Sequence, residues 1–325
     1  MANNKNNFLI TGGAGFIGFS LAKSLIKKAD NLYILDNLSR GRLDNEFKNF
    51  LKNKNVHFFK VNLQNKIDIR LLNLSHIFHL AGSVGVKNIN QDAYGAFLNN
   101  VNTLKNVIDF SKSLKKSPKL IVFSTSEVYS NLIKKNLVKF PINEKNDILI
   151  ENDIIDRDSY FLSKIFNEKL LQLSNLAYII LRPHNIYGPR MGQSHVIPEL
   201  IRKMSLEKIK KIKKTIVFSP NHKRAFCYIN DAIQQITKLS LNKKIKNQTF
   251  NIGNMQEEIK MLDLAQVIKK LVNKKSKIIR GPITKGSPKR RSPDMKKTVK
   301  YSKFKNFTSL NTGLIKTINW YLKNH

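Results

Sequence analysis

The chain has 325 residues, of which 41% are hydrophobic and 9% aromatic. This composition is typical of a folded globular protein of one large or two modest domains and excludes a disordered chain. The formal net charge of +36 comes mainly from lysines. Because these lysines are scattered and not interleaved with aromatic side chains, we interpret the charge as compositional bias and expect no nucleic-acid partner.

Cysteine content and the N-terminal residues bear on the compartment. Cys227 is the single cysteine, so the chain has no internal disulfide and no CxxC metal or redox motif. Residues 1–7 are polar and unlike a signal peptide, and no segment approaches the ~20 apolar residues that cross a bilayer. We therefore expect a cytoplasmic protein with no membrane partner and no bound metal.

In the first half, short apolar runs alternate with amphipathic stretches. The runs predict strands at residues 8–11, 32–36, 56–61, 76–80, 120–124 and 177–181. The stretches between them predict helices at 15–28, 46–52, 93–113 and 159–174. Nearly continuous apolar strands separated by helices indicate an α/β fold with a doubly wound parallel Rossmann sheet, covered on both faces.

After Pro183 the pattern changes to longer loops and shorter helices, at about 198–206, 231–239, 262–272 and 313–321. One late strand, at residues 250–253, is expected to return to the main sheet. We predict a cofactor-binding domain over residues 1–182, joined by 226–253. Residues 183–225 and 254–325 are predicted to form a smaller, mixed α/β substrate-binding lobe.

A glycine-rich segment lies between the first predicted strand and the first helix. Gly12 allows the tight turn, Gly15 lets the backbone approach a pyrophosphate, and Gly18 permits close packing of helix on strand. Phe16 and Ile17 lie at the start of that helix, whose N-terminus attracts the pyrophosphate. This context predicts a dinucleotide site.

Asp36 ends the second predicted strand at the distance expected of a ribose-binding acid, followed by Asn37. A carboxylate there accepts hydrogen bonds from the ribose hydroxyls and repels a 2′-phosphate, so it selects NAD over NADP. Arg40 and Arg42 lie nearby and could weaken this preference.

Tyr160 and Lys164 form a YxxxK pair, which a helix places on one face. A nearby ammonium group favours the phenolate form of tyrosine and so suits the phenol to act as a general base. Residues 124–129, which read STSEVY, follow the strand at 120–124 and would supply a hydroxyl partner.

Together these motifs resemble those of the extended short-chain dehydrogenases/reductases, the NAD-dependent epimerase/dehydratase family that modifies nucleotide sugars. The resemblance begins with the glycine spacing GxxGxxG. It implies further cofactor contacts at Asn62, Leu63, Leu80, Ala81, Gly82 and Asn100, with Asn99 as an adjacent alternative to Asn100. It also implies that Lys164 holds the nicotinamide ribose of NAD and that Tyr160 contacts the cofactor.

The same resemblance extends to the chemistry and to the second half. It implies a catalytic set of Thr125, Tyr160 and Lys164, with Ser126 in the substrate site. Segments at 182–189, 224–231 and 291–294 resemble family motifs. They assign a nucleotide-diphosphate sugar to Asn185, Arg224 and Arg291, where bidentate guanidinium groups suit phosphate oxygens. Family members usually dimerise through two helices, here 93–113 and 159–174, so a homodimer is expected.

The resemblance implies that Tyr160 acts as the base while NAD takes a hydride from C4 of the sugar, which gives a 4-keto intermediate. The reaction of this intermediate depends on Glu127, which we also count as catalytic. The resemblance leaves three reactions open. Many 4-epimerases lack an acid at this position, whereas 4,6-dehydratases and UDP-glucuronate decarboxylases have one. The decarboxylases generally carry Arg after YxxxK, where this chain has Ile165. We favour a nucleotide-sugar epimerase, with decarboxylase or dehydratase as alternatives.

An alternative of another class is an RNA-binding or regulatory module that has kept the fold and lost its chemistry. The basic charge of the chain would suit such a module. The presence of Thr125, Tyr160 and Lys164 argues against it, because a binding module needs none of them.

Overall fold

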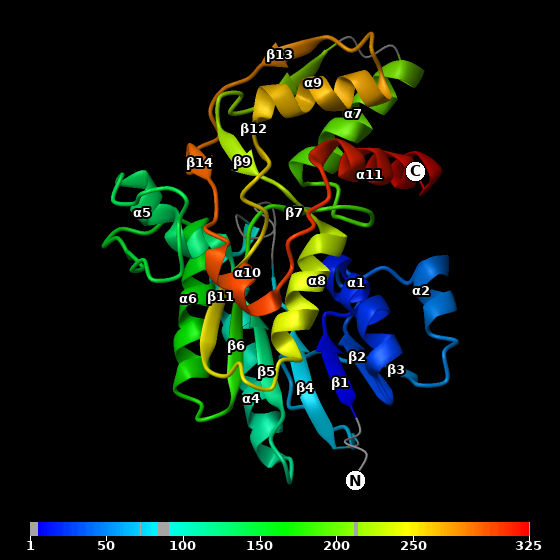
Figure 1. The fold of residues 1–325 in the computed structure, drawn as a ribbon, viewed down its shortest axis with the longest axis vertical. Coiled ribbons are helices and arrows are strands. Elements are labelled where there is room, and N and C mark those ends of the chain that lie inside the picture. Colours follow the sequence, from blue (N-terminus) through cyan, green and yellow to red (C-terminus); the bar gives the residue numbers. More distant parts are fainter. Residues whose placement is uncertain (1–5, 72, 84–90, 211–213, 325) are drawn as a thin grey trace. The chain divides into compact units, whose positions relative to one another are not determined.

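The computed structural model describes residues 6–71, 73–83, 91–210 and 214–324, with the side chains of 207–210 excepted (Figure 1). The chain divides into two compact units, each assembled from separate segments. Unit 1 comprises Met1–Val128, Ile150–Arg182 and Ile233–Phe250, and unit 2 comprises Tyr129–Leu149, Pro183–Ala232 and Asn251–His325. Among the described residues, no helix is long and apolar enough to cross a membrane.

Unit 1 is built on a parallel sheet of seven strands in the order β11-β6-β5-β4-β1-β2-β3. Their bounds are β1 Asn7–Thr11, β2 Asn31–Asp36, β3 Val56–Lys60, β4 Leu74–His79, β5 Lys119–Phe123, β6 Tyr178–Pro183 and β11 Gln248–Ile252. The chain runs outward from β1 to β3 and then returns to the other side of β1 with β4. In such sheets ligands bind at this reversal, beyond the carboxyl ends of the strands.

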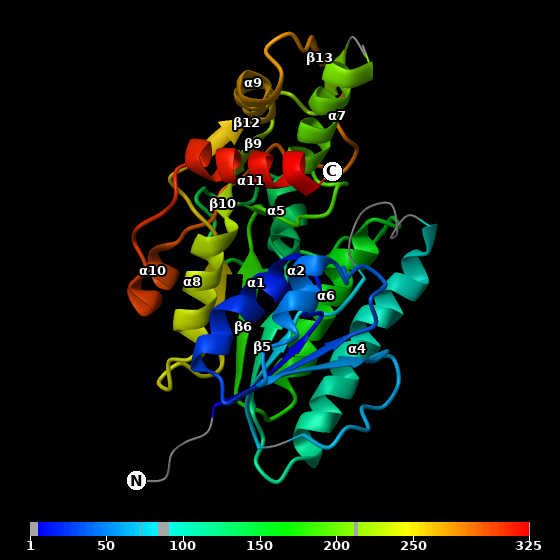
Figure 2. The same ribbon diagram turned by 90° about the vertical axis from the view of Figure 1, so that its right-hand side faces the viewer.

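Helices cover both faces of the sheet. Those of unit 1 are α1 (Phe16–Leu25), continued by the 3₁₀ turn η1 (Ile26–Lys28), α2 (Asn45–Phe50), α4 (Ala93–Ser113), α6 (Asp158–Gln172) and the later part of α8 (Ile229–Ser240). Figure 2 shows α4 and α6 on one face and α1 on the other. Asn167 Nδ2 donates to Asn100 O (3.0 Å) between α6 and α4, and Ser24 Oγ lies 3.4 Å from Thr237 Oγ1 between α1 and α8.

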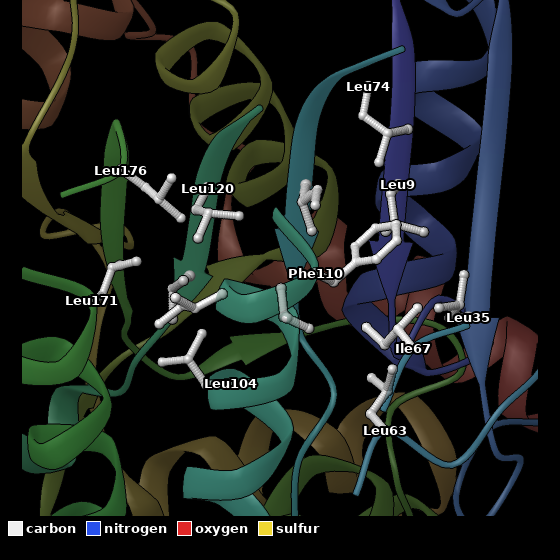
Figure 3. Packing of buried hydrophobic residues seen from close by; sticks show 14 of the residues in the cluster. Leu9, Leu35, Leu63, Ile67, Leu74, Leu104, Phe110, Leu120, Leu171 and Leu176 are labelled. Atoms are coloured by element: carbon white, nitrogen blue, oxygen red, sulfur yellow. The ribbon is translucent and has the colours of Figure 1, made fainter. Parts of the chain in front are cut away.

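One hydrophobic core of unit 1 lies between one face of the sheet and the helices α4 and α6 (Figure 3). In α4 the buried positions recur every three or four residues, as in Leu104, Val107 and Ile108, because only one helical face meets the sheet. They pack against strand residues such as Leu9 and Leu120, both with no exposed surface. Each fully buried side chain of this kind stabilises the fold by about 1.5–3 kcal/mol, so the strand ends are held rigidly.

Within its described residues, unit 2 contains three small sheets and five helices besides the early part of α8. The sheets are β12-β9-β14, β10-β7 and β13-β8, formed by β7 Ile186–Tyr187, β8 Thr215–Val217, β9 Lys223–Ala225, β10 Cys227–Tyr228, β12 Glu258–Lys260, β13 Ile278–Arg280 and β14 Arg290–Arg291. The helices are α5 Ser130–Lys134, α7 Val196–Lys210, α9 Met261–Val272, α10 Lys296–Ser302 and α11 Leu310–Asn324. The early part of α8 also belongs to this unit.

The sequence places residues 129–149, 226–232 and 251–253 with the cofactor-binding domain, whereas contacts in the structure group these segments with unit 2. Residues 129–149 belong to unit 2 because they pair with segments far along the chain. Ile142 N donates to Ser292 O (3.0 Å) and Asp294 N donates to Ile142 O (2.7 Å). Glu144 Oε1 accepts from Asn251 N (2.7 Å). Contacts between segments so distant in the chain leave no periodic pattern in the sequence.

Candidate active site

The predicted glycine-rich segment forms a tight turn between β1 and α1. Gly12 has φ +72°, which favours glycine, and a Cβ there would lie 2.8 Å from Ala81 N. Its own N–H donates to Leu35 O (2.8 Å). Gly15 precedes the first residue of α1, and no side chain caps this helix N-terminus. The turn therefore leaves the start of α1 without a competing side-chain acceptor.

The two other motif glycines fit a bound pyrophosphate in different ways. A Cβ on Gly18 would clash with Gly12 O and lie 2.9 Å from Gly13 Cα, so α1 packs on the turn only with glycine at this position. A Cβ on Gly15 would meet only Gly12 O, at 3.3 Å. The space beyond Gly15 is open to a phosphate, which the helix dipole favours. Phe16 and Ile17, in the first turn of α1, are half-buried.

Asp36 lies at the end of β2 beside the glycine turn. Its Oδ2 accepts from Ala14 N (3.0 Å) and its Oδ1 from Leu38 N (2.8 Å). Burial raises the pKa of this carboxyl group, while the two backbone hydrogen bonds act in the opposite direction. A carboxylate has about four lone-pair positions, so acceptor capacity is left for ribose hydroxyls. Asn37 is exposed, and its Oδ1 accepts from Ser39 N (3.0 Å).

The segment after β4 runs alongside the glycine turn. Leu80 N donates to Thr11 O (3.1 Å), and Ala81 N lies 3.3 Å from Thr11 Oγ1. A Cβ on Gly82 would lie 2.6 Å from Asn100 Oδ1 and 3.8 Å from Lys164 Nζ. The predicted cofactor-binding and catalytic residues therefore meet at Gly82.

Asn100 joins three segments of this site. It is 1% exposed. Its Oδ1 accepts from Ser83 N (2.6 Å), and its Nδ2 donates to Ser163 Oγ (2.9 Å). The alternative residue, Asn99, donates through Nδ2 to Ser83 Oγ (2.8 Å). Only Asn100 contacts α6 directly in these hydrogen bonds, at the residue next to Lys164.

Two of the predicted cofactor contacts, Asn62 and Leu63, differ in their surroundings. Asn62 is exposed, and its Oδ1 accepts from Gln64 N (3.1 Å), which shapes the loop after β3. The Leu63 side chain is 4% exposed and packs in the hydrophobic core (Figure 3). At this position only the backbone of Leu63 is placed to contact a ligand.

The predicted catalytic loop follows β5. Thr125 and Ser126 are buried, and Glu127 is half-buried. The 3₁₀ turn η2 spans Ser126–Tyr129. Thr125 Oγ1 accepts from Glu127 N (3.2 Å), so the hydroxyl itself shapes the turn. Because β5 is parallel to β4, this loop emerges at the same sheet edge as Gly82.

Tyr160 and Lys164 lie one turn apart on α6. Tyr160 is half-buried, whereas Lys164 is 4% exposed. Lys164 Nζ donates to Phe123 O (3.0 Å), the last residue of β5. Burial lowers the pKa of Lys164 to about 8, although the carboxylate of Glu168 opposes this change. The buried amine of Lys164 thus reaches the strand end from which the catalytic loop emerges, one helical turn from Tyr160.

The sequence analysis assigned no role to three residues behind this pair. Glu168 forms a bidentate ion pair with Arg182: Nε lies 2.9 Å from Oε1 and Nη2 lies 2.6 Å from Oε2. Ser124 Oγ donates to Glu168 Oε1 (2.5 Å). The spacing of four residues between Tyr160, Lys164 and Glu168 indicates that they share one face of α6. The partner of Glu168, Arg182 on β6, lies too far along the sequence to be predicted from this spacing.

In unit 2 the substrate-binding residues proposed from the sequence gather around β9. Arg224 on β9 and Arg291 on β14 are direct partners in the parallel pair β9–β14, so their side chains leave the same face. Arg224 Nη2 donates to Ser287 Oγ (2.8 Å). Asn185 Nδ2 donates to Ala225 O (3.1 Å), next to Arg224. This face of unit 2 combines two guanidinium groups and an amide.

His222 extends this cationic group and was not among the predicted residues. It is 4% exposed, and its Nδ1 lies 3.3 Å from Ser287 Oγ, which also accepts from Arg224. Burial, followed by the charges of Arg224, Lys289 and Arg291, lowers the pKa of His222. The lowered pKa reflects a positive local potential, which suits an anionic ligand.

These features define a class: a doubly wound nucleotide-binding fold whose Tyr–Lys helix and hydroxyl-bearing loop meet at the switch point of the sheet. A profile of the "NAD dependent epimerase/dehydratase family" matches residues 8–253. The chain belongs to that family and is therefore an NAD-dependent enzyme.

Individual relatives span nearly the whole chain. It is 30% identical to a UDP-N-acetyl-alpha-D-glucosaminuronate decarboxylase of Bacillus cytotoxicus, over 98% of each chain. It is 28% identical to a putative UDP-glucose 4-epimerase of Methanocaldococcus jannaschii, over 98% of this chain and 99% of the relative. Among solved structures, a UDP-N-acetylglucosamine 4-epimerase from Methanobrevibacter ruminantium M1 aligns with a TM-score of 0.83, 21% identity and 99% coverage of both chains, which shows a shared fold.

Proposed function

We propose that the chain oxidises C4 of a nucleotide-diphosphate sugar acid and then releases its C6 carboxyl group as CO₂. The observation that carries the proposal is the pairing of a Tyr–Lys face on α6 with a loop that holds both a hydroxyl and a carboxyl group, Thr125 and Glu127. Oxidation of C4 uses Tyr160, Lys164 and Thr125, and the fate of the resulting 4-keto sugar depends on Glu127.

In the first step Tyr160 acts as the base for the C4 hydroxyl, and Thr125 hydrogen-bonds that hydroxyl and orients it. Lys164, held by Phe123 O (3.0 Å), places a positive charge beside the phenol and favours its deprotonated form. When bound, NAD accepts the hydride of C4 and later returns it. General-base catalysis of this kind contributes about 10²–10⁴-fold.

In the second step the chemistry of the sugar acid does most of the work. A 4-keto group is β to the C6 carboxylate, so the C5–C6 bond breaks and its electron pair forms an enolate across C4 and C5. C5 must then receive a proton. Glu127 lies two residues beyond Thr125 and is half-buried, and we assign it that proton transfer. The identity of 30% with a decarboxylase over nearly the whole chain supports this assignment.

Recognition of the diphosphate is assigned to unit 2. Arg224 and Arg291, paired across β9 and β14, offer two guanidinium groups to a ligand that carries two phosphate charges. Asn185 adds an amide beside Arg224. Guanidinium–phosphate hydrogen bonds are charge-assisted and about twice as strong as neutral ones.

A second candidate is 4-epimerisation, in which the keto sugar turns over and is reduced on its other face. One residue favours it: Ile165, where decarboxylases of the family generally have Arg, is 6% exposed and packs in the protein. The 28% identity with a putative 4-epimerase is the other support. No chemistry at C5 would then be required of Glu127.

The deciding experiment is mass spectrometry of the products formed from UDP-glucuronic acid, UDP-N-acetylglucosaminuronic acid, UDP-glucose and dTDP-glucose in the presence of NAD. Loss of CO₂ from either acid supports the proposal. An unchanged mass with a new chromatographic peak establishes epimerisation, and loss of water establishes a dehydratase. Tyr160→Phe is the control and should abolish every conversion. If no sugar is converted, RNA binding at physiological salt would test the binding-module alternative.

Glu127→Gln separates the two steps. The variant should still reduce NAD when the sugar acid is added, because Thr125, Tyr160 and Lys164 are intact. The enolate formed on loss of CO₂ then lacks its proton donor, so steady-state CO₂ release should fall about 10²-fold or more. NADH is followed by its absorbance and CO₂ by mass spectrometry. Normal turnover by the variant would remove Glu127 from the mechanism and favour epimerisation.

A further inference from the structure

The end of β5 and one face of α6 are joined residue by residue. Lys164 donates to Phe123 O (3.0 Å), and Glu168, one turn further along α6, accepts from Ser124 Oγ (2.5 Å). Tyr160 lies one turn earlier on α6. The proposed mechanism pairs it with Thr125, the residue that follows Ser124. These two hydrogen bonds therefore hold both the Tyr–Lys face of α6 and the start of the catalytic loop to the end of β5.

Glu168 and Arg182 are among the most deeply buried charges of unit 1, with side chains 2% and 6% exposed. Each carboxylate oxygen of Glu168 accepts from the guanidinium group, and one also accepts from Ser124. Burying a carboxylate costs several kcal/mol unless it is paired and hydrogen-bonded. The Glu168 side chain thus has a guanidinium group on both oxygens and a hydroxyl donor on one of them.

Without Glu168, this region would hold two buried cations, Lys164 and Arg182. Among the described residues, Glu168 is the carboxylate whose charge opposes the lowered pKa of Lys164, and the other groups near Lys164 are not carboxylates. Those groups are Tyr160 on α6, His79 at the end of β4, and the amide of Asn100 on α4. The pKa of His79 is lowered to about 3 by burial and by the charge of Lys164, so His79 is neutral and offers no compensation.

We propose that Glu168 is a positioning residue whose carboxylate keeps the buried Lys164 ammonium charged beside Tyr160, and that Arg182 and Ser124 hold that carboxylate in place. The proposal rests on the role assigned above to Lys164. Arg182 limits the effect: by neutralising part of the carboxylate charge, it leaves the Lys164 proton less tightly held than a lone Glu168 would. Lys164 and Glu168 then form one electrostatic unit with Arg182.

The test reads the ionisation of Lys164 directly, by NMR titration of the free protein with ¹³Cε-labelled lysine. The Lys164 signal is identified by its absence in Lys164→Met. Its pKa, about 8 in the wild type, should fall by about one pH unit or more in Glu168→Gln. In Arg182→Met it should rise, because Glu168 then acts without its neutralising partner. Glu168→Asp, which keeps the charge, should restore a value near that of the wild type.

Two further variants keep the test decisive. Glu168→Gln removes the bidentate partner of Arg182 and costs stability, whereas Glu168→Gln/Arg182→Met removes both charges of the ion pair. The double variant should give a pKa below that of the wild type but above that of Glu168→Gln. Asp109→Asn is the matched control: Lys105 and Asp109 form an exposed i,i+4 pair on α4, and this change should leave Lys164 unaffected.

Opposite shifts in Glu168→Gln and Arg182→Met support the proposal, because loss of packing alone gives no such pair of signs. An unchanged Lys164 pKa in Glu168→Gln and in the double variant overturns it. The titration needs neither substrate nor NAD, so it separates this proposal from the proposed reaction, which stands or fails on the products found by mass spectrometry.

Discussion

At the scale of single residues, a buried imidazole governs part of the response to acid. His79 is 1% exposed, and its Nδ1 lies 2.9 Å from Thr11 Oγ1. Its pKa is lowered from 6.5 to about 3. The unfolded chain therefore binds a proton at His79 below pH 6.5, while the folded chain does not until about pH 3, so stability falls as the pH falls through this window.

We expect this group to lower the free energy of unfolding by about 2 kcal/mol between pH 7 and pH 5. His79→Gln should remove that part of the loss, so the stabilities of variant and wild type should converge as the pH falls. Urea denaturation at both pH values measures the difference. A constant difference between the two proteins would show that His79 does not carry the effect.

Site residues could be predicted from the sequence where the proposed chemistry lies in a local motif. Gly12, Asp36 and Lys164 could be chosen because their spacing from a strand or from one another defines their surroundings. Glu168 could not, since its meaning depends on Arg182, which reaches it from another element. The roles of all these residues in binding and catalysis stay predictions until variants are measured.

At the scale of elements, the turn between β1 and α1 gives two glycines different duties. Gly18→Ala would force a Cβ against Gly12 O and to within 2.9 Å of Gly13 Cα, which are backbone atoms and cannot move aside. Gly15→Ala meets only Gly12 O, at 3.3 Å, and fills the space left for a pyrophosphate.

Gly18→Ala should therefore lower the melting temperature of the protein without cofactor by several degrees, at a cost of about 1–3 kcal/mol. Gly15→Ala should leave that temperature nearly unchanged but weaken NAD binding about tenfold or more. Thermal denaturation and NAD titration on both variants check this. Equal loss of stability in both would contradict the division of roles.

The long elements were predictable and the short ones were not. Every strand expected in the first half is present, and α4 matches residues 93–113. These elements bury continuous runs or one helical face, so their periodicity is strong. The strands β7, β9, β10 and β14 have two or three residues each, and such lengths contain no period. In unit 2, pairing between distant segments decides the structure.

At the scale of the whole molecule, the net charge of +36 should act on association. The proposed substrate is an anion, so a positive field raises its rate of encounter, and salt screens this effect. We expect kcat/KM for a nucleotide-sugar acid to fall about tenfold from roughly 0.05 to 0.5 M salt, with kcat nearly unchanged. Steady-state kinetics with sucrose as the uncharged control measures this. A salt-independent kcat/KM would mean that the charge has no part in capture.

Each compact unit is formed by three separate segments of the chain. The order of these segments along the chain constrains folding during biosynthesis. The sheet of unit 1 lacks its edge strand, β11, until residues near 250 have been made. Lys119 Nζ donates to Ser240 O, Asn242 O and Ile245 O, which are synthesised later than β5. On the ribosome the growing chain must therefore hold an incomplete nucleotide-binding sheet while the first two segments of unit 2 are synthesised. Neither unit forms from one continuous stretch of chain, and a chain that stalls before β11 exposes an open sheet edge to aggregation or to chaperones.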